Sequence, residues 1–415
     1  MLCHVMPNNV QSQKQIILTK ITNNMVSRCF AHVGQALFAV ERYCEHTIVF
    51  DCGGEDQDMV KRAIYDVFRD DEIIDILFIS HYDRDHINGI QFLLKNHTVR
   101  HIVLPMIEEP TKAIMAHGML DAGDNDGAHF VLNPVQLVSN FVQRNRLDGY
   151  DSDYPKVHYV QPWTEETNRG LRDVGEEGYP RVSDIDEIGE YIAAGVALTI
   201  NRKTRWCEQV CQKPNPKCPC RWIYLPFNRQ VMTSDQVQAF WRELGMPENS
   251  KCDDVLPGWE DVRKQIKSAW STATGLRKSD INDYSMTLYS GCRFPLHFNA
   301  CLFTGDYNAR SYMTELRTAY KILWDNIRVI QIPHHGSQNN FHKDLIIHHG
   351  VHVISNRNQP KNNRQVNDTA VINKILSRGE YVAKTSHQNF YTPNEDYYWD
   401  DRYRLDYCEY CEQCR

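Results

Sequence analysis

Apolar and polar positions alternate in blocks between residues 35 and 104, and these blocks have the lengths of strands and helices. Four apolar runs are short and nearly continuous, as in strands buried in a sheet: 35–40, 47–50, 73–79 and 99–104. Apolar residues at helical spacing predict one helix over 59–69 and a second that begins near His86. Strands that alternate with helices predict an α/β sheet with helices on its faces.

The same pattern returns after residue 285, beyond a long stretch with little periodicity. Five further strands are predicted: 285–289, 300–304, 327–332, 351–354 and 381–385. Helices are predicted over 311–324 and 369–377. The predicted organisation is a first half of one domain (1–105), an irregular, partly Cys-rich insert (106–280), the second half of that domain (281–393) and an acidic, aromatic tail with cysteines (394–415).

Composition narrows the class of protein. The 415 residues carry a formal net charge of -7, so a surface coated with basic residues for nucleic acid is not expected, although a metal centre can still bind phosphates locally. No apolar run reaches the roughly eighteen residues of a membrane span, and residues 1–20 lack the layout of a signal peptide. We therefore expect a cytoplasmic protein, and the 14 cysteines, spread over a long chain, favour metal sites over a disulfide framework.

Metal-type side chains follow three of the predicted strands. His81, Asp83, Asp85 and His86 come just after the strand 73–79. Asp306 follows the strand 300–304, and the pair His334 and His335 follows the strand 327–332. Imidazole nitrogens and carboxylate oxygens are common ligands of divalent metals. Each set alone is also compatible with a solvated turn, but three strand ends with such residues predict a metal centre at the carboxyl edge of the sheet.

The ordered motifs resemble the metallo-β-lactamase superfamily. They are Asp51-Cys52-Gly53-Gly54, then His81 to His86 as HxDxDH, then Thr304-Gly305-Asp306, then His334-His335-Gly336-Ser337. More narrowly, they resemble the hydrolase domain of bacterial DNA-uptake competence proteins and its free-standing relatives. Val33-Gly34-Gln35, Asp83 in place of the usual second His, and the Asn282 to Ser285 segment carry that narrower likeness. The resemblance covers about 33–104 and 282–385 and implies an αββα four-layer sandwich with an irregular insert.

The resemblance also implies a centre with two divalent ions, Zn²⁺ or Mn²⁺. His81 and Asp83 would hold the first ion, and Asp85, His86 and one of His334 or His335 the second. Asp306 would bridge both ions. Asp85 and His335 are the expected catalytic residues, with the second His of the pair acting on the substrate or leaving group. Asp51, Asn282 and Ser285 are expected to support the ligands without binding metal.

Two departures from the family pattern affect the first ion most. The usual third-motif His has no clear counterpart, since His117, His129 and His158 lie in the irregular stretch. The carboxylate oxygen of Asp83 is a harder ligand than a histidine nitrogen. The metal preference of the first position therefore shifts from strict zinc towards manganese or mixed occupancy. The terminal N-x-x-x-H-P segment of the subgroup is degraded to 356–360, beginning at Asn356.

The insert and the tail contain further candidates. Cysteines at metal-ligand spacing could form structural zinc sites, although their spacing is not that of standard knuckles and a frayed terminus is an alternative for the tail: Cys207, Cys211, Cys218, Cys220, Cys408, Cys411 and Cys414. Basic residues between 203 and 221, with Trp206 and Trp222 among them, could track a nucleic-acid backbone or form an ordinary surface loop. Either segment could also bind a protein partner.

The leading hypothesis is a metal-dependent phosphodiesterase or nuclease that uses a metal-activated water and acts on nucleic acid or a nucleotide. Free-standing relatives in the subgroup are often effectors of bacterial antiviral defence, so the resemblance implies that setting. One alternative is a small-molecule hydrolase that cleaves a lactone, thioester or phosphoester. The other is a non-catalytic regulatory module of the same fold, which the lack of a third-motif ligand keeps open.

Overall fold

The computed structural model describes residues 26–43, 46–144, 155–163, 182–185, 188–199, 222–252, 259–275, 285–292, 300–357, 368–385 and 390–391. Within them the strands form two sheets of eight. The first sheet has the order β16 (Phe390–Tyr391), β1 (Ser27–Phe30), β2 (Phe38–Tyr43), β3 (His46–Cys52), β4 (Ile74–Phe78), β5 (Val99–Pro105), β6 (Lys156–Val160) and β8 (Tyr191–Ile192). The second has the order β15 (Tyr381–Lys384), β14 (Val351–Ile354), β13 (Ile327–Gln331), β12 (Ala300–Phe303), β11 (Thr287–Cys292), β10 (Trp222–Phe227), β9 (Ala197–Thr199) and β7 (Val182–Asp184).

Each sheet combines antiparallel and parallel strands. In the first sheet β1, β2 and β3 pair antiparallel, while the strands from β3 to β8 pair parallel. In the second sheet the strands from β9 to β12 pair antiparallel, while those from β12 to β15 pair parallel. Because parallel strands end at the same edge, β3 and β4 in one sheet, and β12 and β13 in the other, can contribute their terminal residues to one site.

The inner faces of the two sheets pack on each other. Phe50 of β3 stacks on Phe303 of β12 with 5.0 Å between ring centroids, and Phe30 of β1 lies 5.7 Å from the same ring. Apolar residues of β4, β5, β10 and β14 complete this shared core. A buried ion pair between Arg28 and Glu41 lies in the same region, and Glu41 also accepts hydrogen bonds from residues of the other sheet. The halves therefore share one core and one polar cluster.

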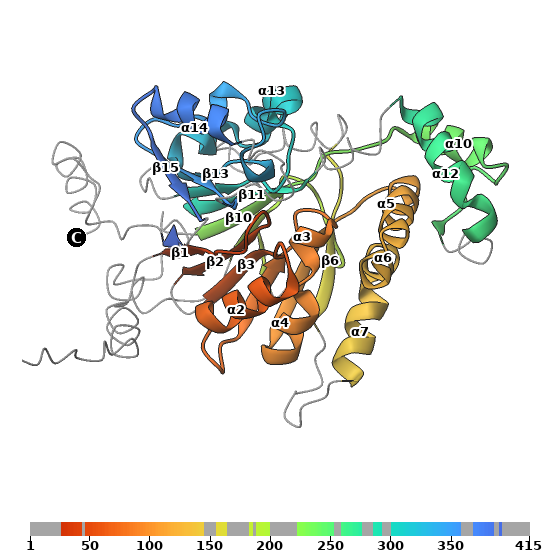
Figure 1. Ribbon diagram of the computed structural model, residues 1–415, viewed down its shortest axis with the longest axis horizontal. Helices are drawn as coiled ribbons and strands as arrows, with labels where there is room; N and C mark the ends of the chain where they lie inside the picture. Colours follow the sequence, from red (N-terminus) through yellow and green to blue (C-terminus); the bar gives the residue numbers. More distant parts are fainter. Residues whose placement is uncertain are drawn as a thin grey trace, which may run out of the picture.

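Helices cover the outer faces. On the first sheet α2 (Gln57–Val67) and α4 (Ile90–Asn96) bury apolar side chains against the strands. On the second sheet α13 (Ala309–Ala319) and α14 (Thr369–Leu376) do the same. Figure 1 shows the first half in red and orange and the second half in blue, each with its helices outside. The order helix, sheet, sheet, helix confirms the predicted α/β sandwich class.

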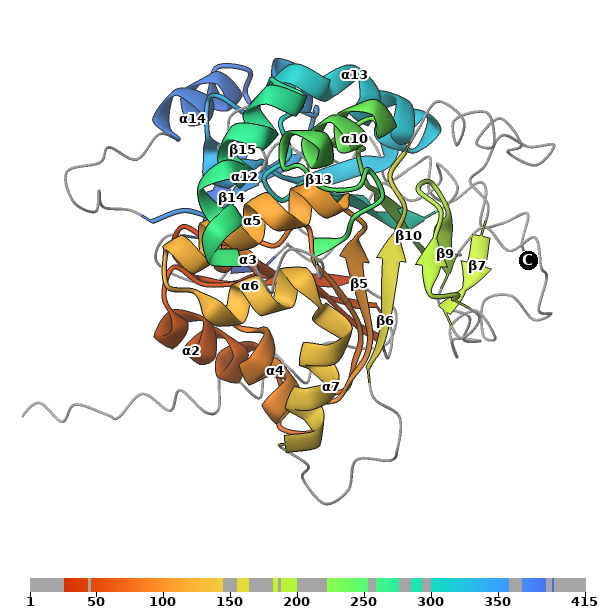
Figure 2. The ribbon, with the colours of Figure 1, turned by 90° about the vertical axis from the view of Figure 1, so that its right-hand side faces the viewer.

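Further helices of the described residues lie beside the sandwich: α5 (Glu109–Asp121), α6 (Asn125–Leu132), α7 (Pro134–Arg144), α10 (Ser234–Glu243) and α12 (Trp259–Thr274). Figure 2 shows α5 and α6 next to the first sheet, with α10 and α12 adjoining α5. Trp241 and Trp270 are fully buried in the layer that α10, α12 and α5 form.

The 106–280 segment contributes more regular structure than its sequence pattern predicts. Besides these helices, it supplies β6 and β8 to the first sheet and β7, β9 and β10 to the second. These strands extend both sheets, so the described part of the segment is continuous with the sandwich. The division of the chain into two halves, an insert and a tail stays a prediction.

The predicted 311–324 helix is wrong in its second half. The α-helix ends at Ala319, and a 3-10 helix, η4 (Lys321–Asn326), follows it. Tyr320, between them, has a non-helical backbone and is buried against β11 through a 2.7 Å hydrogen bond to Thr287. Among the described residues, no helix is both long enough and apolar enough to cross a bilayer.

Candidate metal centre

Four strand ends meet at one edge of the two sheets. Asp51 lies near the end of β3, and the His81 to His86 segment follows β4 and leads into the short helix α3 (Arg84–Ile87). Asp306 follows β12, and His334 and His335 follow β13 in a 3-10 turn, η5 (His334–Gly336). The structure therefore brings together side chains that lie as far as 284 positions apart, from Asp51 to His335.

The Asp306 carboxylate is the centre of the cluster. Its Oδ1 lies 3.3 Å from His86 Nε2 and 3.8 Å from His335 Nε2. Its Oδ2 lies 3.8 Å from His81 Nε2 and 3.7 Å from His334 Nε2. Each oxygen of one buried carboxylate thus faces two imidazoles.

Asp85 completes one side of the cluster. Its Oδ2 lies 3.2 Å from His335 Nε2 and 3.9 Å from His86 Nε2. Two groups of three side chains have donor atoms that all lie within 4.8 Å of one another: His81, His86 and Asp306, and Asp85, His86 and His335. Such compact sets of nitrogen and oxygen donors are typical of divalent-metal sites.

Unsatisfied polar atoms point to the same interpretation. His81 Nε2, His86 Nε2 and Asp306 Oδ1 are buried and have no hydrogen-bond partner among the described residues. A buried polar atom without a partner costs about 1–3 kcal/mol, and a coordinated cation would remove that cost for all three atoms at once. The residues of the site therefore fit divalent metal.

Asp51 supports the cluster through hydrogen bonds with Ser80 and His86. It is fully buried, and its Oδ1 accepts the backbone N–H of Ser80 at 2.6 Å. Its Oδ2 accepts the Ser80 hydroxyl at 2.7 Å and lies 2.8 Å from His86 Nδ1. The N–H at His86 Nδ1 donates to Asp51, so Nε2 faces the centre and can bind a cation once its own proton is lost.

Two serine hydroxyls orient His81 and Asp306. Ser80 Oγ lies 2.9 Å and Ser285 Oγ 3.1 Å from His81 Nδ1, and Ser285 Oγ accepts the backbone N–H of Asp306 at 3.0 Å. Because the Ser80 hydroxyl donates to Asp51, it accepts from an N–H at His81 Nδ1, and the lone pair of His81 is on Nε2. The sequence prediction omitted Ser80, and its position directly before the first His of the motif is the signal that could have identified it.

The turn that carries His334 and His335 has an uncommon backbone. Its residues have φ angles of 50° at His334, 54° at His335 and 85° at Gly336, all in the left-handed region. His335 Nδ1 lies 3.1 Å from the Ser355 carbonyl, and Asn356 donates to the His335 carbonyl at 2.9 Å. At Gly336 a Cβ would lie 2.8 Å from the Cβ of Asp368, so no larger residue fits without movement.

Asn356 was identified in the sequence only as the start of a degraded family segment. In the structure it fixes the backbone of the histidine turn through that hydrogen bond to His335. The first residue of the segment therefore has a structural partner at the site, whereas residues 358–360 lie outside the described residues.

The charged side chains of the cluster shift one another's pKa values. Burial opposes the charged form of His86, but Asp306, Asp51 and Asp85 raise its pKa well above the usual value. Burial would raise the pKa of Asp85, but His86 and His335 lower it to about 2. Burial, together with the charge of His86, lowers the pKa of His81 to about 4. The carboxylates thus stay ionised and favour cations among them.

Not every predicted site residue joins the cluster. Asp83 is the N-cap residue of α3 and belongs to neither of the two compact groups among the described residues, so its role as a ligand stays a prediction. Several candidates lie outside the described residues: Asn282, Cys207, Cys211, Cys218, Cys220, Cys408, Cys411 and Cys414. The prediction that Trp222 belongs to a nucleic-acid loop is wrong, because it is buried in β10, stacks on Tyr43 and donates to Glu41.

Of three comparisons with known proteins, one identifies a family. Residues 35–179 match the family model described as the metallo-beta-lactamase superfamily. Part of the chain is similar to the solved structure of the chemotaxis sensor ODP in a peroxy diiron state, with 20% identity and a TM-score of 0.18 over 23% of this chain and 40% of that one. It is also similar to the human tRNase Z, short form (ELAC1), with 10% identity and a TM-score of 0.30 over 74% of this chain and 92% of that one. No match is found among the curated proteins.

The family match confirms the predicted resemblance to the superfamily. Together with the two compact groups of metal-type side chains, it supports a metal-dependent hydrolase. The narrower likeness to the DNA-uptake subgroup stays a prediction.

Proposed function

With the metallo-β-lactamase superfamily assigned over residues 35–179, we propose that this protein is a metal-dependent phosphodiesterase that acts on nucleic acid or a nucleotide. The observation that carries the proposal is the Asp306 carboxylate, whose two oxygens face different pairs of imidazoles. A carboxylate in that arrangement suits a bridge between two cations. Two divalent ions ~4 Å apart can activate a water and stabilise both oxygens of an in-line displacement at phosphorus.

The donor set divides between two positions. Asp85, His86 and His335 would hold one ion, which we call the second metal position. His81, with Asp83 as predicted from the sequence, would hold the other, the first metal position, and Asp306 would contribute one oxygen to each. His335, rather than His334, would join Asp85, because its Nε2 lies 3.2 Å from Asp85 Oδ2. Mixed nitrogen and oxygen donors suit Zn²⁺ or Mn²⁺.

Hydrogen bonds would orient two of these ligands before metal binds. Asp51 accepts a hydrogen bond from His86 Nδ1–H, and Ser80 accepts one from His81 Nδ1–H, so both Nε2 atoms point inward. A positioned ligand set loses little entropy on binding and keeps the reacting groups in register.

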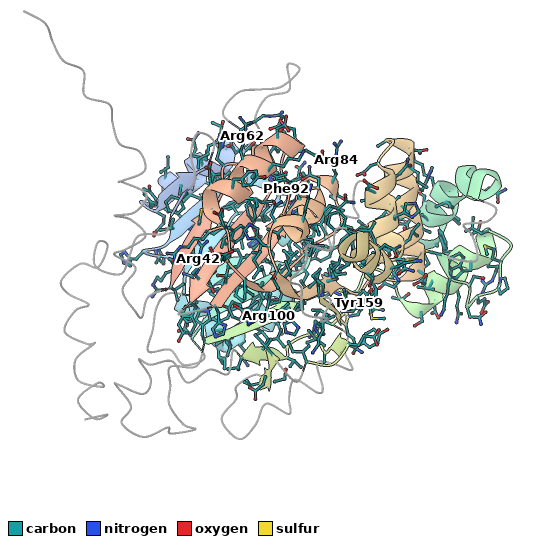
Figure 3. All side chains as sticks on the ribbon, turned by 90° about the horizontal axis from the view of Figure 1, so that it is seen from below. Arg42, Arg62, Arg84, Phe92, Arg100 and Tyr159 are labelled. Atoms are coloured by element: carbon teal, nitrogen blue, oxygen red, sulfur yellow. The ribbon has the colours of Figure 1, made fainter. Side chains whose placement is uncertain are left out.

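Arg84 supports a phosphate-containing substrate. It is exposed at the start of α3, between Asp83 and Asp85, and forms no ion pair with any described residue. Figure 3 shows it on the outside of the first half. A guanidinium beside a metal centre can bind a phosphate oxygen of a polynucleotide. The subgroup resemblance supports the same substrate class, and the defence setting it implies stays a prediction.

The test compares substrates on one metal-defined preparation. The full chain is stripped of metal with a chelator, reloaded with Mn²⁺ or Zn²⁺, and incubated with single- and double-stranded DNA, RNA, bis(p-nitrophenyl) phosphate, a lactone and a thioester. We expect turnover of phosphodiesters only after metal is added. Turnover of the lactone or thioester alone would replace this proposal with the small-molecule hydrolase. Fewer than about one ion per chain after reloading would favour the regulatory module.

A further inference from the structure

Members of the family usually have a further histidine, in their third motif, that binds the first metal. The sequence of this chain has no clear counterpart, and the histidines of the 106–280 segment do not take its place. His158 is engaged at both ring nitrogens, with His101 and with the Gly189 carbonyl. His117 lies 3.4 Å from Asp121 on its own helix, and His129 is exposed on α6. None of the three belongs to a compact metal-type group among the described residues.

His334 lies on the side of Asp306 where that ligand is needed. Its Nε2 is 3.7 Å from Asp306 Oδ2, the same oxygen that lies 3.8 Å from His81 Nε2. The other oxygen, Oδ1, faces His86 and His335. Donor atoms bound to one tetrahedral ion at ~2.1 Å lie about 3.4 Å apart. His334 lies in neither compact group of the described residues, so its ring would have to move towards His81 for both nitrogens to bind one ion.

The His334 ring has little else to hold it. Its Nδ1 is buried and has no hydrogen-bond partner within the described part of the chain, whereas Nδ1 of His335 lies 3.1 Å from the Ser355 carbonyl. About a third of the His334 side chain, 34%, is exposed, compared with 4% for His335. The two rings are also nearly perpendicular, at 83°, with centroids 5.9 Å apart. They are therefore turned to different sides of the same carboxylate.

The backbone adds an independent observation. Two consecutive non-glycine residues in the left-handed region cost on the order of 1–2 kcal/mol each, and such strain persists where the surroundings enforce it. Strain at His335 alone would orient a ligand for the second metal position. His334 shares this backbone conformation, and its imidazole faces the other oxygen of Asp306.

We propose that His334 is a ligand of the first metal position, together with His81 and Asp306 Oδ2, in place of the third-motif histidine. The inference rests on the proposed function, because it requires that the cluster binds two ions. It assigns the adjacent histidines to different ions.

Metal binding tests the assignment without an activity assay. Metal-depleted chain is titrated with Mn²⁺ and followed by calorimetry and by electron paramagnetic resonance, which detects the coupling between two bridged ions. We expect about two ions per chain with a coupled signal. In His334→Ala the affinity of one ion should fall at least about 10–100-fold and the signal should become that of an isolated ion. His335→Ala should weaken the other ion, and His348→Ala, which changes an exposed histidine paired with Glu380, should behave as the wild type.

A second variant keeps the test independent of folding. His334→Gly removes the imidazole but suits a positive φ, so circular dichroism and the unfolding midpoint should match the wild type while the ion is still lost. If His334→Ala and His334→Gly both keep two coupled ions at wild-type affinity, the assignment of His334 is overturned and the proposed function stands. If the wild-type chain never binds two ions, the proposed two-ion centre fails, and that result is obtained before any variant is made.

Discussion

The two turns that carry the proposed metal ligands are held in place by different interactions. Each follows a buried parallel strand, β4 in the first sheet and β13 in the second. In the first turn Asp83 has an ordinary φ of -66°, and the hydrogen bonds that the imidazoles donate to Ser80 and Asp51 orient them. In the second turn the backbone itself is left-handed at three residues in a row. Side chains behind the ligands fix the first turn, whereas backbone conformation fixes the second.

Asp306 lies between the two turns, and its removal should have the largest effect. In Asp306→Ala both metal positions lose an oxygen, so we expect kcat/KM for a phosphodiester to fall by more than ~10²-fold, the upper range seen for residues that only support ligands. Metal content, measured by plasma mass spectrometry, should fall with it. Circular dichroism should remain unchanged, and Asp344→Ala, at an exposed carboxylate, is the control. Full activity in Asp306→Ala would refute the bridging role.

Asp51→Asn tests the first turn alone. Asn tolerates the φ of 56° at this position, so the backbone should be kept while the charge that orients His86 is lost. We expect metal affinity to fall about 10–100-fold, with most of the loss at the position that includes His86. Calorimetric titration with Mn²⁺ measures it. An unchanged affinity would mean that the hydrogen bond between His86 and Asp51 does not position the first turn.

The residues of the sandwich were largely predictable, because buried strands and amphipathic helices have distinct patterns. The prediction of 351–354 matches β14, and that of 327–332 differs from β13 by one residue. In the 106–280 segment the helix α5 was not predictable in the same way. On α5, buried residues occur on nearly every side, so no polar face marks it as a helix. In β10, Pro226 argues against a central strand although the segment is fully buried.

Most side chains of the candidate site were predictable from the sequence, but not which histidine of the pair lies beside Asp85. His81, Asp85, His86, Asp306 and the histidine pair were all identified from strand ends, and the structure brings them together. The sequence could not show which histidine of the pair faces Asp85, because that choice depends on the φ angles of the turn. Nor could it show that Ser80 contacts both Asp51 and His81, since hydroxyl contacts of this kind depend on the packing of β3 against β4.

Gly336→Ala tests the second turn through its backbone. At a φ of 85° the new Cβ would lie 2.8 Å from Asp368 Cβ and 3.1 Å from an Ile354 methyl carbon. We expect a loss of about 1–3 kcal/mol in the free energy of unfolding, and weaker metal binding at the second position. Gly379→Ala is a matched control, because its φ is 77° and a Cβ there meets nothing within 4 Å. If both variants lose the same stability in urea titrations and bind metal equally, the crowding at Gly336 has no role in holding the histidines.

The smallest expected effect concerns substrate rather than metal. Arg84 lies within the first turn but faces outward, so Arg84→Ala should leave both ions in place. Exposed ion pairs contribute about 1 kcal/mol or less, so KM for a polynucleotide should rise a few-fold with kcat unchanged, and the difference should shrink at high salt. Arg62→Ala is the control, because Arg62 is also exposed on the first half, on α2, at a distance from the ligand turns along the chain (Figure 3). An equal rise in both variants would indicate a general charge effect, whereas a rise in Arg84→Ala alone would mean that Arg84 binds a phosphate of the polynucleotide.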